Sequence, residues 1–288
     1  MKNPLRKRLP KELVGDLSKY LVVFLFMTLT IGMISGFLVA DDSMLQAYDE
    51  SFEKYNIEDG NFTLAAEADD ALIDEIEKSD VTVCEHFYLE QKTEKGVDST
   101  LRIFKERDKV DLVCLMDGEM PASEDEIALD RMYAKNNDLA IGDAVTIGGT
   151  EYTISGLVAL SDYSALFQNN NDSMFDSVKF GVGIVTDNCF DSLTKTKLVY
   201  NYAYKLDNKP SSDTELNEVT EELMKKVSHL TSVESFVPEY SNQAIHFTGD
   251  DMGSDKAMMI VLLYIVIVIM AFVFSITTKN TIHKEANV

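Results

Sequence analysis

Two long runs of apolar residues divide the chain. Residues 20–40 and 257–278 contain no charged side chain. As α-helices with a rise of 1.5 Å per residue, each run would reach roughly 30 Å, the thickness of a membrane's hydrocarbon core. The first run exceeds the apolar core of about 7–15 residues in a cleaved signal peptide, and Leu38 stands where a small residue is expected before a cleavage site. We therefore predict two transmembrane helices, the first of them retained as an anchor.

The residues between the two runs alternate between helix and strand patterns. Leu45, Tyr48 and Phe52 are spaced so that the first span can continue as a helix. A strand, a helix with Asp69 as its cap, and further strands follow. Near the second span, a helix lies between two more strands. The ranges are strands 61–68, 81–91, 99–105, 198–206 and 231–237, and helices 68–80 and 211–230.

A block with shorter elements separates these two β-α-β ends. Residues 126–130 predict a strand and residues 131–138 a short helix. Gly148 and Gly149 then form the two-residue turn of a hairpin between alternating strands. The predicted fold is therefore a membrane protein in which two transmembrane α-helices flank a mixed α/β domain over 41–256. This domain has β-α-β units and an inserted β-rich lobe at about 114–197.

Charge adds an orientation to this layout. The net charge is −23 and the isoelectric point about 4.4, which argues against a nucleic-acid partner. Basic residues are concentrated in 1–19 and recur in 279–288, whereas the flanks that face 41–256 are mostly acidic. The positive-inside rule then places both termini in the cytoplasm and 41–256 outside, in a multi-pass protein of the cell membrane.

Two patterns near the first span concern its surroundings. Residues 10–21 have an apolar and a polar side, which indicates a cytoplasmic helix within 1–19 that lies on membrane lipid; alternatively, the basic residues at 6–11 only set the topology. Small side chains recur every fourth residue in the span and predict helix packing, although glycine is also common in membrane helices. These residues are Thr28, Gly32, Gly36 and Ala40.

The chain has no recognisable catalytic, phosphate-binding or zinc-binding motif. Cys84 and His86 would share one face of a strand, but a metal site needs more ligands than these two. We therefore predict no catalytic, cofactor-binding or metal-ligating residue and no enzymatic activity. Three cysteines lie between the spans; one pair could form a disulfide, and buried thiols are the simpler interpretation.

Several stretches together resemble an FtsX-like ABC transporter permease with a MacB-type extracytoplasmic core domain. NPLRKRLPKELVGDLSKYLVVFLFMTLTIGMISGFLVADDSM is similar to the surface helix and first span of such permeases. EIALDRMYAKNNDLAIGDAVTIGGTEYTISGLVA is similar to part of the core domain. HKEANV is similar to the start of the cytoplasmic segment that follows the second span. The large domain between spans one and two also matches, so the resemblance covers the whole chain.

This resemblance implies a permease subunit, or a fragment of one, that transmits ATPase-driven motion to an extracytoplasmic domain for export, extraction or signalling. It implies a cytoplasmic ABC ATPase that hydrolyses ATP, and a second permease copy or half. An extracytoplasmic protein or peptide could be a further partner. Residues 279–288 would begin a coupling segment that continues into further spans, with Lys284 and Glu285 near the ATPase.

The residues alone also fit a second function. A two-span membrane sensor would bind a ligand in its extracytoplasmic domain and pass a shift through the second span to a cytoplasmic signalling module. The hairpin-rich lobe and the surface helix favour the permease, whereas a helical signalling linker after Val288 would favour the sensor. A membrane-tethered enzyme has no supporting motif.

Overall fold

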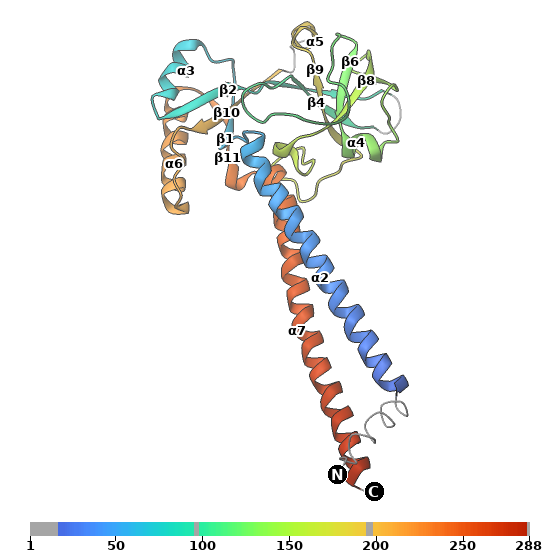
Figure 1. Ribbon diagram of the computed structural model, residues 1–288. Coiled ribbons are helices and arrows are strands. Elements are labelled where there is room, and N and C mark those ends of the chain that lie inside the picture. Colours follow the sequence, from blue (N-terminus) through green and yellow to red (C-terminus); the bar gives the residue numbers. More distant parts are fainter. Residues whose placement is uncertain (1–16, 95–97, 194–197, 287–288) are drawn as a thin grey trace. The chain divides into compact units, whose positions relative to one another are not determined.

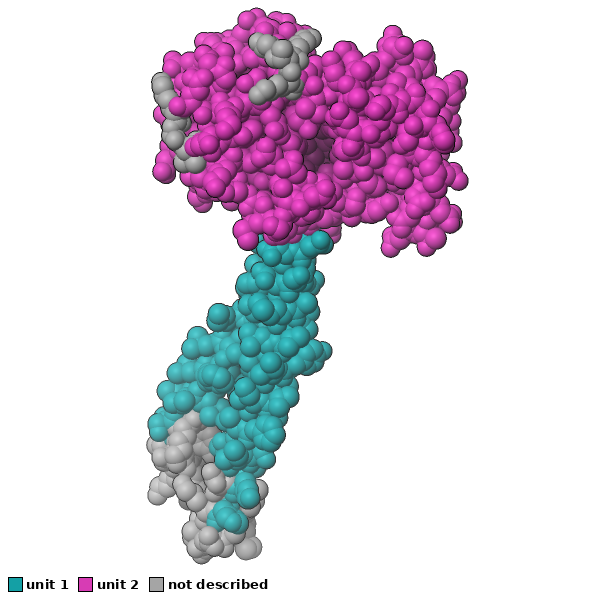
Figure 2. All heavy atoms as spheres, turned by 180° about the vertical axis from the view of Figure 1, so that it is seen from behind, with its two compact units in different colours: residues 1–48, 249–288 teal, residues 49–248 magenta. Residues whose placement is uncertain are grey.

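The computed structural model describes residues 17–94, 98–193 and 198–286 (Figure 1). The chain divides into two compact units (Figure 2). One unit comprises residues 1–48 and 249–288, and the other comprises residues 49–248. The predicted fold class is confirmed, because two long apolar helices flank a mixed α/β sheet domain.

The first unit is a pair of long helices. Helix α2 spans Leu17–Lys54, and α7 spans Gln243–Ala286, so both continue without a break beyond the apolar segments. Both are long and apolar enough to cross a membrane. Lys256 of α7 forms an ion pair with Asp42 of α2, and Gly249 lies against the ring of Tyr48. These contacts join the two helices near the polar ends of their apolar segments.

The second unit is built on one sheet. Within the described residues the sheet has eleven strands. Nine of them follow the order β11-β1-β10-β3-β4-β9-β6-β8-β5, and the other two pair beside this path, β2 with β10 and β7 with β8. The pairs β4–β9 and β6–β8 are parallel and the other pairs are antiparallel. The strands are β1 Gly60–Leu64, β2 Val81–Glu85, β3 Tyr88–Lys92, β4 Thr100–Lys105, β5 Cys114–Gly118, β6 Glu126–Asp130, β7 Ala144–Ile147, β8 Thr150–Ala159, β9 Phe180–Val185, β10 Leu198–Leu206 and β11 Val233–Pro238.

Short-range signals explain most of the helices of this unit. The Asp69 side chain accepts the Leu72 N–H at the start of α3, which confirms the predicted cap. Asp130 and Thr186 cap α4 and α5 in the same way. Helices α3 and α6 pack together. The helices are α3 Asp70–Glu77, α4 Arg131–Asn136, α5 Asp187–Ser192 and α6 Asp213–Leu230, with 3-10 turns η1 Ser161–Tyr163 and η3 Glu239–Ser241.

The strand predicted over 81–91 is wrong in one respect, because the structure breaks it after Glu85. Strand β2 pairs with the second half of β10, whereas β3 pairs with its first two residues and with β4. His86 lies at this break, and its backbone N–H donates to the Asn201 carbonyl. In the sequence, apolar and polar side chains continue to alternate through the break, so this pattern does not reveal it.

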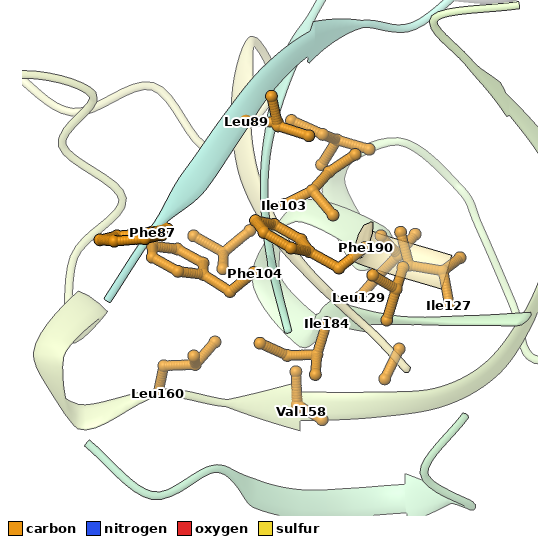
Figure 3. Close-up of a cluster of buried hydrophobic side chains, with 14 of the residues drawn as sticks. Phe87, Leu89, Ile103, Phe104, Ile127, Leu129, Val158, Leu160, Ile184 and Phe190 are labelled. Carbon is orange, nitrogen blue, oxygen red and sulfur yellow. The ribbon is translucent and has the colours of Figure 1, made fainter. Parts of the chain in front are cut away.

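The core of the unit lies along this sheet (Figure 3). Ile103 and Phe104 of β4, Ile127 and Leu129 of β6, and Ile184 of β9 are almost fully buried. The burial of these side chains from strands distant in sequence provides the main stabilising term for the unit. The second unit is therefore expected to be rigid, because packed cores deform little.

Strand β9 offers a test of this packing at Gly181. A Cβ added there would lie 2.4 Å from Cγ of Tyr133, whose hydroxyl is held 2.7 Å from Ser99 Oγ. We expect Gly181→Ala to lower the free energy of unfolding by about 1–3 kcal/mol through overpacking. Chemical denaturation of the purified chain measures it. Gly253→Ala is the control, because no atom lies within 4 Å of its added Cβ; equal stability of the two variants would contradict the prediction.

Candidate functional site

The predicted packing stripe lies on the exposed side of α2. Thr28, Gly32, Gly36 and Ala40 are all exposed, and no atom lies within 4 Å of a Cβ added at either glycine. The less exposed side of α2 carries a different set of residues, which includes Ile34 and Asp41. The stripe is therefore not occupied by α7, and its packing against another helix stays a prediction.

The other predicted positions lie at the ends of the chain. Lys284 and Glu285 belong to the last turns of α7, but their side chains are outside the described residues. The predicted surface helix falls in residues 1–19, of which 1–16 are outside the described residues. The coupling role of both segments stays a prediction.

A buried polar cluster lies in the second unit, where three segments converge. Glu58 lies between α2 and β1, His86 lies between β2 and β3, and Asp111 lies in the loop before β5. One ligand atom of each side chain lies within 4.8 Å of the others. His86 Nδ1 is 3.5 Å from Asp111 Oδ2 and 3.9 Å from Glu58 Oε2. These residue types can bind a metal ion.

In both Glu58 and Asp111, one carboxyl oxygen accepts a hydrogen bond and the other oxygen faces the His86 imidazole. Asp111 Oδ1 accepts the Glu58 backbone N–H at 2.9 Å, and Glu58 Oε1 accepts Asn61 Nδ2–H at 2.6 Å. Asp111 has a φ of 52°, and its N–H donates to the Asn56 carbonyl at 3.1 Å. The loop therefore holds Asp111 in an unfavourable backbone conformation that fixes its side chain in the cluster.

A buried ion pair lies beside these three residues. Arg107 Nη1 donates to Asp162 Oδ2 at 2.8 Å and to the Asp111 carbonyl at 3.2 Å. The guanidinium also lies 4.2 Å from the centre of the Phe104 ring, a cation–π contact. Both charged side chains are almost fully buried. Arg107 thus gives the cluster its positive charge and ties it to the core.

Burial shifts the titration of these groups. It raises the pKa of Glu58 to about 7, with the Asp162 charge acting in the same direction and hydrogen bonds from Asn61 and Asn242 opposing it. Burial, followed by the Glu58 and Asp162 charges, raises the pKa of Asp111 well above its usual value. Burial and the Arg107 charge lower the pKa of His86 well below its usual value, so the imidazole is neutral at pH 7.

The cluster borders a polar cavity of about 470 Å³. Glu58, His86 and Asp162 contribute to its wall, together with Arg102. Arg102 is held in place, because it donates to Glu90 Oε1, to the Tyr163 hydroxyl and to the Gln168 carbonyl. The cavity wall therefore contains polar groups that the fold holds in place.

The three cysteines lie in different places. Cys189 is buried, Cys84 and Cys114 are partly exposed, and all three are free thiols. The Tyr55 hydroxyl donates to Cys114 Sγ at 2.9 Å. The interpretation as buried thiols therefore holds for Cys189, but it is wrong for Cys84 and Cys114, which are partly exposed.

No protein-family model and no curated protein matches the chain. Several solved structures match it in fold, among them two outer domains of ABC transporters. The extracellular domain of the noncanonic ABC-type transporter YknZ from Gram-positive bacteria is 13% identical, with a TM-score of 0.36, and the match covers 62% of this chain and 97% of that one. The periplasmic region of MacB from Actinobacillus actinomycetemcomitans is 11% identical, with a TM-score of 0.35, and the match covers 59% and 83%.

Sequence reasoning considered His86 but not its partners. Glu58 and Asp111 are among 49 acidic residues, and no spacing distinguishes them. Glu58 precedes the strand predicted over 61–68, whereas His86 lies inside the strand predicted over 81–91 and Asp111 adjoins no predicted strand, so the sequence does not show that the three meet. Only the pairing of β10 with both β2 and β3 brings His86 to this place.

Proposed function

We propose that the chain is a permease subunit, or part of one, of an ABC transporter of the FtsX and MacB type. In this role it transmits motion driven by a separate ATPase across the membrane to the second unit, outside the cell. The observation that carries the proposal is the continuity of α2 and α7. Each runs as one helix from its apolar segment into residues of the second unit. An unbroken helix transmits a shift or rotation of its membrane segment better than a flexible linker would.

The strands next to these helices support the same function. β1 follows α2 after a short link, β11 precedes α7, and the two strands pair from Gly60↔Pro238 onward. At this point Lys209 Nζ lies 2.8 Å from Asp59 Oδ1 and 2.9 Å from Glu239 Oε2. The Glu239 N–H donates to the Asp59 carbonyl at 3.0 Å. The segment between α2 and β1 is thus bonded to the segment between β11 and α7, as well as being joined to it through the sheet.

Partners and orientation follow from the charge pattern and the sequence resemblance. The basic flanks favour cytoplasmic termini, with 41–256 outside the cell. The chain carries no phosphate-binding motif, so ATP hydrolysis would belong to a cytoplasmic ABC ATPase. A second permease copy or half would complete the membrane part. A protein or peptide outside the cell is the remaining partner that the resemblance implies.

The proposal is tested by the distance between the two helices. Spin labels at Ser43→Cys and Ser254→Cys, which are exposed on α2 and α7, report it in a chain whose native cysteines are replaced by alanine. We expect the distance distribution to change when ATP is added in the presence of the partner ABC ATPase. A hydrolysis-deficient ATPase is the control for turnover. An unchanged distribution in a complex that does hydrolyse ATP would contradict the proposal.

The exposed stripe on α2 yields a further prediction. Gly36→Leu places a bulky side chain where close helix approach requires a small one, so we expect assembly with a second permease copy or half to be lost. Pull-down of a differently tagged copy from detergent measures this. Val39→Leu is the matched control, because Val39 is exposed but lies off the stripe. Equal assembly of both variants with the same partner would refute the role of the stripe.

The polar cavity favours the sensor as a second candidate. A site of about 470 Å³ lined by fixed polar groups could bind a small polar ligand. In that case the distance between the spin labels would respond to the ligand without an ATPase. The same labelled chain therefore distinguishes the two functions.

A further inference from the structure

The ligand atoms of the buried cluster have the spacing of a metal site. Bonds of about 2.0–2.2 Å to zinc place neighbouring ligand atoms in a tetrahedron about 3.3–3.6 Å apart. His86 Nδ1 lies 3.5 Å from Asp111 Oδ2 and 3.9 Å from Glu58 Oε2. The two distances to the imidazole nitrogen are thus close to this spacing, and all three ligand atoms lie within 4.8 Å of one another.

Unpartnered atoms point to a ligand independently of this spacing. Asp111 is fully buried, and its Oδ2, which faces His86 Nδ1, accepts no hydrogen bond. Asp162 Oδ1 is likewise buried without a hydrogen-bond partner. A buried carboxylate oxygen without a partner costs several kcal/mol, so such atoms are expected to bind an ion or a proton.

The charge of the cluster fits a divalent cation. When ionised, Glu58, Asp111 and Asp162 would together exceed the single positive charge of Arg107 by two. An ion of charge +2 would neutralise this excess. The hydrogen bonds on Asp111 Oδ1 and Glu58 Oε1 would orient the two carboxylates, as the outer contacts of metal ligands do.

We propose that Glu58, His86 and Asp111 bind one divalent transition-metal ion in the second unit. One imidazole nitrogen and two carboxylate oxygens suit Zn²⁺ or Mn²⁺ better than Ca²⁺ or Mg²⁺, which take oxygen ligands. With Nδ1 on the metal, Nε2 carries the ring proton. The ion would join the link after α2, the β2–β3 break and the loop before β5. It would therefore hold the link between α2 and β1 in place.

The test uses the full chain in detergent, with any histidine tag removed and metals stripped by a chelator. Zn²⁺ and Mn²⁺ are added separately at neutral pH, and bound metal is measured by mass spectrometry and the melting temperature by circular dichroism. We expect one ion per chain and a higher melting temperature. Asp111→Asn and His86→Gln should each weaken binding by at least about 100-fold, because even outer contacts of metal ligands are worth 10–100-fold.

Asp130→Asn is the matched control. Asp130 is also a buried carboxylate, but it caps α4, where asparagine caps equally well, so metal binding should be retained. Without metal, Asp111→Asn should melt no lower than the wild type, since it removes a buried charge. If that variant does not fold, Glu58→Gln replaces it.

Two results would overturn the proposal. One is a wild-type chain that binds neither ion and does not change its melting temperature, which would leave protons as the ligand of the cluster. The other is equal binding by the wild type, Asp111→Asn and His86→Gln, which would place the ion elsewhere.

Discussion

Replacing Arg107 by methionine is expected to lower the free energy of unfolding of the second unit by about 3–5 kcal/mol. The substitution keeps much of the side-chain volume over Phe104 but removes the charge that faces Asp162. Asp162 and Asp111 then remain buried without a counter-ion, and the Asp111 carbonyl loses a donor. Chemical denaturation of the metal-stripped chain, followed by near-ultraviolet circular dichroism of its 12 tyrosines, measures the effect.

Arg131→Met is the control for this prediction. Arg131 is exposed, so the same substitution there should change stability by no more than about 0.5 kcal/mol. A second variant, Arg107→Met with Asp162→Asn, should recover part of the loss because it removes one of the stranded charges. The electrostatic account is refuted if Arg107→Met and Arg131→Met are equally stable.

Phe62→Ala is expected to destabilise the second unit by about 3–5 kcal/mol, the usual cost of removing a buried aromatic ring. Phe62 of β1 is fully buried and stacks on Tyr202 of β10 and Phe236 of β11. Its loss opens a cavity where the strands adjoining α2 and α7 are joined. The melting temperature should fall by on the order of 10 °C, since each kcal/mol is worth about 2–4 °C at this size.

The matched variant is Phe62→Leu, which fills most of the cavity and should cost clearly less than alanine. Equal stability of the alanine and leucine variants would contradict the cavity as the cause of the loss.

The elements that sequence reasoning predicted correctly depend on local physics. The two apolar runs, the Asp69 cap and the Gly148–Gly149 turn each involve residues close in sequence. Both glycines of that turn have positive φ, at 57° and 87°, as a tight hairpin requires. The helical continuation of the first span is confirmed as well, because α2 runs to Lys54.

The start of α7 shows where local reasoning was insufficient. Residues 243–256 contain two glycines and several acidic residues, which disfavour a helix, yet α7 begins at Gln243. At Gly249 a Cβ would meet the Tyr48 ring at 2.5 Å, so a contact with α2 requires glycine there. Tertiary packing therefore outweighs intrinsic propensity in this segment.

The buried cluster could not be predicted for a related reason. Glu58 and Asp111 are joined by the hydrogen bond from the Glu58 N–H to Asp111 Oδ1, across 53 residues of chain. Nothing near either residue in the sequence marks this partner. The positive φ of Asp111, at a residue other than glycine, is also invisible to a pattern of polar and apolar positions.

The pairing of β1 with β10 and β11 has a consequence for biosynthesis. Strand β1 finds its partners only after nearly all of the second unit has been synthesised, because Gly60 pairs with Tyr204 and Pro238. If the unit lies outside the cell, its polypeptide must cross the bilayer unfolded. Strand β1 then stays unpaired at the membrane surface until β11 has crossed. Contacts of such sequence separation slow folding and prolong the exposure of unpaired strand edges. These edges would be exposed from the translocation of β1 until the arrival of β11.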